Sequence, residues 1–279
     1  MNRILSAAFA ATFAMPALAA DMTVTIPFAA EIGGQPFSCA ATYAGMGAAA
    51  TTVTAPDFRL FVSNVAMIRT NGSLEPVTLD QDSQWQLKSL ALLDFEDATG
   101  ACGNGTPGTH TALTGTVAEG DYTGLAFTVG LPFEQNHQDP TLAPAPLNTT
   151  AMFWNWQGGY KFVRIDMVPT DRKADGPKGW FLHLGSTMCD AASKTSAPTG
   201  CQNPNRLEIR LEGFDPARNV VVIDPAPVVA GADLRVNAPE TSPGCMSFLK
   251  DADCMTVMAR LGLPYMDVPA GPQSLVSMR

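Results

Sequence analysis

The feature of this sequence that most restricts its fold is a series of short runs in which apolar and polar residues alternate. Turn-forming residues separate the runs, and the chain has 24 glycines and 22 prolines. A two-residue period places alternate side chains on opposite faces of a strand. The clearest runs are MTVTIPFAAEI, DFRLFVSNVAMI, TALTGTVAEGDYTGLAFTVGLPF, YKFVRIDMVP, GWFLHLGST, RLEIRLEGF and NVVVIDPAPVVA. We therefore predict an all-β fold, an antiparallel β-sandwich or barrel.

Helical periodicity is clear only near the C-terminus, in DADCMTVMARLGL. The apolar residues that recur there at near-helical spacing are Ala252, Met255, Met258 and Leu261. Gly262 and Pro264 follow as a stop signal. The sequence thus predicts a short C-terminal helix attached to the β-rich domain.

The N-terminus has the features of a cleaved secretory signal peptide, residues 1–20. Arg3 precedes an apolar run, and a small-x-small pattern ends it at Ala17-Leu18-Ala19. No later apolar run reaches the roughly 18 residues that a membrane helix needs. No low-complexity linker divides the remainder, so we expect residues 21–279 to form one domain of a soluble protein that is periplasmic or secreted.

The chain contains six cysteines, an even number. In an exported protein this predicts disulfides. Sequence proximity favours Cys245 with Cys254 and Cys189 with Cys201, which leaves Cys39 with Cys102 by elimination, although other pairings stay open. A zinc site made of these thiols is a weaker hypothesis, because the spacings lack a Cys-x-x-Cys knuckle.

Charge and missing motifs exclude several functions. The chain has 17 basic and 26 acidic residues, a formal net charge of −9, and no basic patch, so nucleic acid is a poor candidate partner. There is no Gly-x-Ser-x-Gly or His-Glu-x-x-His motif of a hydrolase. No Cys-x-x-Cys-His motif for covalent haem occurs either. These absences make a hydrolase or a protein with covalently attached c-type haem a weak hypothesis.

The stretch AMFWNWQGGYKFVRID, residues 151–166, places two tryptophans two positions apart. The turn signal Asp175-Gly176-Pro177 predicts that the strand YKFVRIDMVP and the strand GWFLHLGST form a hairpin. Gly158-Gly159 could add a bulge. If the first strand is continuous instead, one face carries four rings, Trp154, Trp156, Tyr160 and Phe162.

Histidine positions add a chemical possibility to this stretch. His110 lies in a polar segment near a turn and is expected at the surface. His137 lies in the loop before the tryptophans, and His183 lies in the second strand of the hairpin, so both approach the same tryptophan-bearing strand. Imidazole suits copper, and thioethers are candidate further donors. The methionines that could supply them are Met152, Met167 and Met188.

Calcium is a weaker candidate cofactor. Asp94, Glu96 and Asp97 in LLDFEDATG offer the oxygen ligands that calcium prefers. Carboxylates at the end of a strand more often form turns and caps.

Six segments in this order resemble the MbnP-like family, also called the metallo-mystery pair four-Cys-motif proteins. They are DFRLFVSNV, WQLKSLALLDFED, PFEQNHQDP, APLNTTAMFWNWQGGYKF, FLHLGSTMC and PGCMSFLKDADC. The resemblance covers most of the mature chain. It implies a secreted, β-rich protein, not itself an enzyme, that binds copper or a copper-carrying small molecule, in copper acquisition or homeostasis, as in the methanobactin system.

The resemblance also implies a partner, a MauG-like di-haem enzyme called MbnH, which oxidises a tryptophan of its MbnP to kynurenine. Kynurenine then helps to hold copper. Trp154 and Trp156 match the family's Trp-x-Trp pattern and are the candidate targets, with Trp85 and Trp180 as alternatives. An intact tryptophan could not ligate a metal, because its indole nitrogen is only a donor.

The same resemblance makes His137 and His183 the candidate copper ligands. The four-Cys name fits Cys39, Cys102, Cys189 and Cys201, with Cys245 and Cys254 as a further pair, and we assign all six to structure.

Two other hypotheses compete with the copper site. The tryptophans could form an exposed stacking platform for a carbohydrate or another small ligand. They could also be plain hydrophobic core, which is the usual role of aromatic residues in a strand. The sequence leaves open which tryptophan is oxidised, the oxidation state of copper and the oligomeric state.

Overall fold

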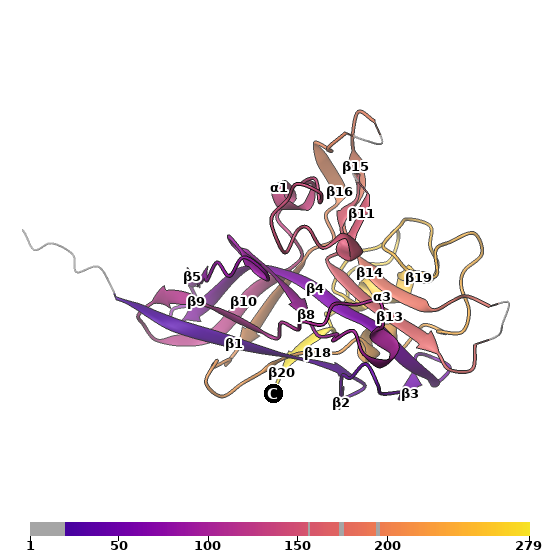
Figure 1. The fold of residues 1–279 in the computed structure, drawn as a ribbon, viewed down its shortest axis with the longest axis horizontal. Coiled ribbons are helices and arrows are strands. Elements are labelled where there is room, and N and C mark those ends of the chain that lie inside the picture. The colour runs from indigo at the N-terminus through magenta and orange to yellow at the C-terminus, as the bar shows by residue number, and fades with distance from the viewer. Residues whose placement is uncertain (1–19, 156, 173–175, 194–195) are drawn as a thin grey trace, which may run out of the picture.

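The computed structural model describes residues 20–155, 157–172, 176–193 and 196–279. Within these residues the predicted all-β fold is confirmed, with two large sheets and two small two-stranded ones (Figure 1). The predicted signal peptide, residues 1–20, lies outside the described residues except for Ala20, and Trp156 and Asp175 also lie outside them. None of the helices described is long and apolar enough to cross a membrane.

The smaller of the two large sheets has the strand order β20-β18-β1-β9-β6. Its long strand β1 pairs antiparallel with β9 through residues 21–27 and parallel with β18 through residues 28–30. A short strand, β2, pairs with the end of β1. The strands are β1 (Asp21–Ile32), β2 (Gln35–Pro36), β6 (Thr78–Leu79), β9 (Ala112–Ala118), β18 (Val221–Ile223) and β20 (Val276–Met278).

The larger sheet has the order β17-β10-β4-β13-β14-β19, with β3, β5 and β8 also paired to β4 and β7 paired to β8. The long strand β4 therefore lies at its centre. Its members are β3 (Tyr43–Met46), β4 (Thr51–Arg69), β5 (Leu74–Pro76), β7 (Gln86–Leu87), β8 (Leu90–Asp94), β10 (Tyr122–Val129), β13 (Val163–Pro169), β14 (Trp180–Leu184), β17 (Leu207–Glu212) and β19 (Gly244–Cys245). The predicted hairpin is confirmed, because β13 and β14 pair antiparallel with Arg164 opposite His183.

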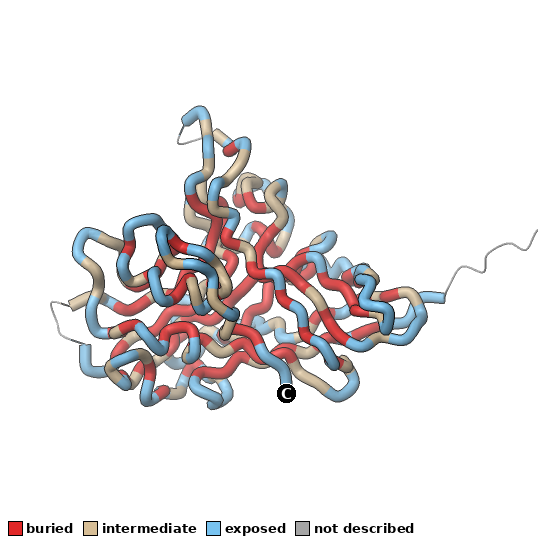
Figure 2. Tube along the Cα trace, turned by 180° about the vertical axis from the view of Figure 1, so that it is seen from behind, coloured by how far each residue is buried: buried red, intermediate tan, exposed pale blue. Residues whose placement is uncertain are grey.

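The main hydrophobic core packs against one face of the larger sheet. Alternate residues of the central strands enter it, among them Phe58 and Leu60 of β4, Ile165 of β13 and Leu182 of β14. Buried residues run through the middle of the strands, and exposed residues gather in the loops (Figure 2). The intervening residues of the same strands point to the opposite face of the sheet, and the candidate site lies on that face.

A second, smaller core lies apart from the first. Its buried members are Phe61, Leu90, Leu92, Leu131, Leu147, Met152, Tyr160 and Phe162. Because Phe61 follows Leu60 in β4, the two cores take side chains from opposite faces of that strand.

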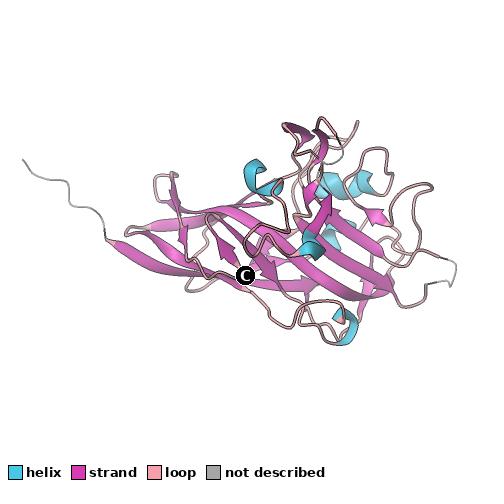
Figure 3. Ribbon diagram, turned by 45° about the horizontal axis from the view of Figure 1, so that its top comes forward, coloured by secondary structure: helices cyan, strands magenta, loops and turns pink. Residues whose placement is uncertain are grey.

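Helices are short and lie at the edges of the strands (Figure 3). The predicted C-terminal helix is confirmed as α3 (Cys254–Arg260). The run NVVVIDPAPVVA is not one strand, since only its first half forms β18 and its second half forms α2 (Ala226–Val229). Proline in the first helical turn explains the difference, because its fixed φ suits a helix start and its missing N–H is not needed there.

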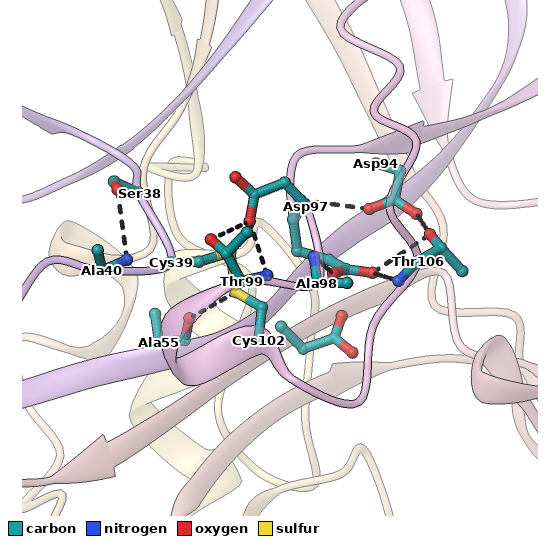
Figure 4. The surroundings of a disulfide bond; sticks show 12 residues. Ser38, Cys39, Ala40, Ala55, Asp94, Asp97, Ala98, Thr99, Cys102 and Thr106 are labelled. Atoms are coloured by element: carbon teal, nitrogen blue, oxygen red, sulfur yellow. Dashed lines mark hydrogen bonds between the residues drawn. A yellow bond between two sulfur atoms is a disulfide. The ribbon is translucent and has the colours of Figure 1, made fainter.

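The three disulfides have the connectivity that sequence proximity favoured: Cys39–Cys102, Cys189–Cys201 and Cys245–Cys254. Two of them are buried, while both cysteines of the pair Cys189–Cys201 are partly exposed. Figure 4 shows Cys39–Cys102, which ties the loop after β2 to the 3₁₀ helix η1 (Gly100–Cys102).

Figure 4 labels two of the three acidic residues considered for calcium, Asp94 and Asp97, and all three bond within the protein. Asp94 accepts a hydrogen bond from the Thr106 hydroxyl, and Glu96 accepts one from the backbone N–H of Thr106 at 2.6 Å. Asp97 accepts bonds from the backbone and hydroxyl of Thr99. These carboxylates shape a turn after β8, which is the usual role of acidic residues at the end of a strand. The calcium site stays a prediction.

The buried carboxyl of Asp94 should make the stability of the protein depend on pH. Burial raises the pKa of this carboxyl from 3.8 to about 7, against the opposing charge of Arg59. Between pH 3.8 and about 7 the carboxyl therefore keeps its proton in the folded protein but loses it in the unfolded chain. The stability of the folded protein falls as the pH rises through this range, because unfolding then releases a proton. Relative to the unaltered protein, Asp94→Asn should gain stability across that range, by at most about 4 kcal/mol. Urea unfolding at a series of pH values measures the difference, and parallel curves for the two proteins would contradict it.

Candidate metal centre

The tryptophan stretch folds as a tight hairpin and not as one continuous strand. Strand β11 (Phe153–Asn155) pairs antiparallel with β12 (Gly159–Tyr160), placing Phe153 opposite Tyr160 with their rings 5.2 Å apart. The Asn155 side chain accepts hydrogen bonds from the backbone N–H groups of residues 157 and 158, which closes the turn. Gly159 supplies the positive φ of +72° that the turn needs.

This turn corrects the arrangement expected for a continuous strand. Tyr160 and Phe162 enter the smaller core, and Phe153 packs against that core too. Trp154 follows Phe153 in β11 and therefore faces the other way. The chain reverses at the glycines, so Trp154 does not share a face with Tyr160.

The indole of Trp154 packs against backbone and two other rings. A Cβ on Gly185 would lie 2.5 Å from Trp154 Cζ3, and one on Gly158 would lie 3.4 Å from Trp154 Cε3. The ring of Phe248 lies 5.4 Å from the indole, and the imidazole of His183 lies 6.5 Å from it. Trp154 is thus half-buried and in contact with one of the predicted ligands.

His183 is held with one nitrogen engaged and the other available. It lies on the face of β14 opposite the main core, only 6% exposed, and its ring stacks on Phe181. Nε2 lies 2.6 Å from the Asp166 carboxylate, so Nε2 carries the proton and donates it. Nδ1 is buried and has no hydrogen-bond partner among the described residues. In the neutral ring this nitrogen bears a lone pair, which a metal ion can accept.

The charge state of His183 suits the same role. Burial lowers the pKa of His183 below the usual value for imidazole, and the hydrogen bond to Asp166 opposes this only in part. Burial would raise the pKa of Asp166, but the hydrogen bond from His183 and the charge and hydrogen bond of Arg164 lower it overall. The pair is therefore a neutral imidazole bonded to a carboxylate, the arrangement that commonly orients metal-binding histidines.

Asp166 is in turn fixed by a buried ion-pair network on the same face of the sheet. Arg164 pairs with Asp166 at 2.9 Å and with Asp57 at 3.1 Å. Asp57 also pairs with Arg59, which reaches Glu96 at 3.6 Å. These charges sit on adjacent strands, since Asp57 is opposite Asp166 and Arg59 is opposite Arg164 in the β4–β13 register. The network keeps the Asp166 carboxylate charged and immobile under His183.

Lys161 adds a partly buried cation near this network. Its ammonium donates to the carbonyl oxygen of Ala151 at 2.7 Å, which Arg164 also approaches at 3.1 Å. Burial lowers the pKa of Lys161 to about 8. Both bonds tie the network to the chain just before Trp154.

His137 reaches the tryptophan hairpin through its neighbour. It follows the short helix α1 (Phe133–Asn136), and its ring packs on Phe133 at 4.7 Å. The Asn136 amide donates to His137 Nε2 at 3.1 Å and to the carbonyl of Gly158 at 3.3 Å, while its oxygen accepts from the backbone N–H of Tyr160. His137 Nε2 also lies 3.6 Å from the sulfur of Cys201.

The two predicted ligands thus approach the hairpin in different ways. His183 contacts Trp154 directly, whereas His137 is linked to the same hairpin by Asn136. A cavity of about 170 Å³ opens beside the tryptophan hairpin, lined in part by Asn155, Gly158, Met188 and Phe248. Neither imidazole lines this cavity. Of the predicted thioether donors, Met152 and Met167 are fully buried in the two cores, and Met188 is the one that is exposed.

The remaining tryptophans occupy other places. Trp180 is fully buried in the main core, on the face of β14 opposite His183. Trp85 stacks on His110 at 5.6 Å with nearly parallel rings. The surface position expected for His110 was wrong, because its ring is partly buried against Trp85 and bonds to the carbonyl of Leu92. No tryptophan among the described residues forms an exposed platform of the kind a carbohydrate needs.

Several residues of this site were missed by sequence reasoning. Asp166 and Arg164 lie within the alternating run YKFVRIDMVP, where their polar positions indicate an outer strand face but not a buried network. Asn136 precedes His137, and Phe248 lies in a segment far along the chain. The alternation of the two hairpin strands was the one available signal, since it put Asp166 and His183 on the same face.

These observations define a class of protein: a disulfide-linked β-sandwich-like domain that presents a tryptophan beside a carboxylate-oriented histidine. A sequence model of the MbnP family matches residues 21–247, and the chain belongs to that family. The solved structure of MbnP from Methylosinus trichosporium is similar, with a TM-score of 0.84 and 30% identity over 93% of this chain and 98% of that one. No curated protein matched the chain.

The packing of Trp154 can be tested with a matched pair of glycine variants. A methyl group at Gly185 would lie 2.5 Å from the indole and 2.8 Å from the Tyr160 carbonyl, whereas one at Gly158 would make ordinary contact at 3.4 Å. Gly185→Ala should therefore lower the free energy of unfolding by about 1–3 kcal/mol, and Gly158→Ala should change it little. Chemical denaturation gives both values, and equal stability of the two variants would refute this packing.

Proposed function

We propose that this protein binds copper through His183 and His137, together with a kynurenine formed by oxidation of Trp154. The observation that carries the proposal is the buried Nδ1 of His183, which is without a hydrogen-bond partner among the described residues and lies on a ring that contacts Trp154. A neutral imidazole is a good ligand for copper. Asp166 would orient that imidazole and raise its basicity.

The chemistry of tryptophan explains why oxidation is part of the proposal. The indole nitrogen has no free lone pair, so intact Trp154 cannot bind a metal. A partner oxidase that uses dioxygen or peroxide as oxidant would cleave the indole C2–C3 bond and add two oxygen atoms, which gives a formamide and a ketone. Hydrolysis of the formamide by one water then releases formate and leaves an aromatic amine beside the ketone. Both provide donor atoms for a metal, and they would form beside His183.

Trp154 is the preferred target because of its surroundings. Trp180 is fully buried, and Trp85 packs on His110 instead of a predicted ligand. Trp154 is half-buried and packs on Phe248, whose side chain is exposed, so this part of the molecule is open to an oxidising enzyme. Trp156 lies outside the described residues and remains the alternative suggested by the family's Trp-x-Trp pattern.

The family gives this site its biological setting. We propose that the protein is a periplasmic or secreted component of copper acquisition or homeostasis, as in the methanobactin system, and is not itself an enzyme. Its partner would be a MauG-like di-haem oxidase of the MbnH type. The three disulfides support an oxidising compartment outside the cytosol.

Mass spectrometry of the protein co-expressed with its di-haem partner tests the target. Peptide mapping should place kynurenine at position 154. Trp154→Phe should abolish the modification and weaken copper binding, whereas Trp85→Phe, a matched control outside the site, should leave both unchanged. Kynurenine elsewhere, with tryptophan intact at 154, would refute the assignment of Trp154.

Asp166→Asn tests the orientation of His183. Arg164 would hold the amide oxygen and turn the NH₂ group towards Nε2, which would move the imidazole proton to Nδ1. Copper affinity should then fall by about 10- to 100-fold. Glu212→Gln, which breaks the exposed ion pair Arg210–Glu212, is the control and should bind copper with the same affinity as the unaltered protein. Competition with a chelator measures each affinity, and equal affinities would exclude Nδ1 as the copper ligand.

A further inference from the structure

The geometry points to a second, redox-dependent metal site made of His137, Cys189 and Cys201, which would bind copper(I) once the disulfide between the two cysteines is reduced. One donor atom from each of the three residues lies within 4.8 Å of the others. His137 Nε2 is 3.6 Å from the Cys201 sulfur. The inference stands apart from the proposed kynurenine site, because it needs neither Trp154 nor His183 and shares only His137 with it.

Exposure makes this disulfide the one that a reductant can reach. Cys39, Cys102, Cys245 and Cys254 are each at most 4% exposed, so the two disulfides that they form are shielded. Cys189 and Cys201 are partly exposed, in strands β15 (Thr187–Asp190) and β16 (Gly200–Asn203). These strands form a hairpin that projects from the body of the molecule next to α1 (Figure 1).

The hairpin would hold both sulfurs in place after reduction. Cys189 and Cys201 are directly opposite each other, with Thr187 opposite Asn203 on one side and Asp190 opposite Gly200 on the other. Thr199 donates its backbone N–H to the Asp190 carbonyl, and Asn203 bonds to the Thr187 hydroxyl. Strand pairing therefore fixes the two thiols beside each other without the covalent bond.

His137 is held independently of the disulfide. Asn136 bonds to its Nε2 and to the tryptophan hairpin, and Phe133 packs on its ring. The nitrogen that Asn136 contacts is also the one near Cys201, so a metal ion would replace the amide as its partner. Reduction would thus expose a donor set that is already assembled.

The redox step is a two-electron reduction of the disulfide. A dithiol reductant breaks the S–S bond, supplies two electrons and two protons, and becomes a disulfide itself. Copper(I) then displaces the two thiol protons and binds two thiolates and one imidazole, a soft donor set that favours copper(I) over hard cations. In the oxidised state neither sulfur is a thiolate, and this site is closed.

The test uses the full mature protein produced without the di-haem partner, so that its outcome does not depend on oxidation of Trp154. Treatment with tris(2-carboxyethyl)phosphine under mild conditions should release two thiols, which mass mapping after alkylation should place at Cys189 and Cys201. After removal of the phosphine, copper(I) affinity is measured anaerobically by competition with bicinchoninate.

The reduced protein should bind one copper(I) ion at least about tenfold more tightly than the oxidised protein, with thiolate-to-copper charge-transfer absorption. His137→Ala and alkylation of the two thiols should each remove this gain. His110→Ala, a histidine packed on Trp85, should retain it. Circular dichroism checks that each protein stays folded. No released thiols, equal affinity of the reduced and oxidised proteins, or full affinity in His137→Ala would overturn the inference.

Discussion

The hydrogen bond between Asp166 and His183 is the interaction on which the candidate site depends. It fixes the proton on Nε2 and leaves Nδ1 as a buried lone pair beside Trp154. A lone carboxylate under this histidine would be costly to bury. The ion pair with Arg164 offsets that cost, and Asp57 links Arg164 to Arg59 on the neighbouring strand. One face of the large sheet thus carries the main core, and the other carries both the smaller core and the charged residues that orient this imidazole.

The position of Trp154 follows from a backbone constraint. The hairpin reverses at Gly158-Gly159, so Trp154 turns away from the small core and towards Gly185 and His183. A side chain at either Gly159 or Gly185 would collide with neighbouring atoms, Asn136 in the first case and the indole in the second. Close approach of the Gly185 backbone to the indole therefore places an oxidisable residue next to the imidazole of His183.

Local patterns in the sequence predicted much of the fold but less of the site. A two-residue period is a local signal, which is why the hairpin β13–β14 and the strand position of His183 could be predicted. The break of the tryptophan strand depended on the Asn155 side chain, and the contact between His137 and Cys201 depends on residues distant in the chain. Neither has a periodic signature. The buried ion network was hidden because its charged residues have the same alternation as an exposed strand face.

The most direct test of the central claim is a crystal structure of the copper-loaded protein isolated from its native source. The account predicts copper bonded to Nδ1 of His183 and to a kynurenine at position 154, with the Asp166 carboxylate still accepting from Nε2. Copper bound elsewhere, or bound beside an intact Trp154, would contradict it.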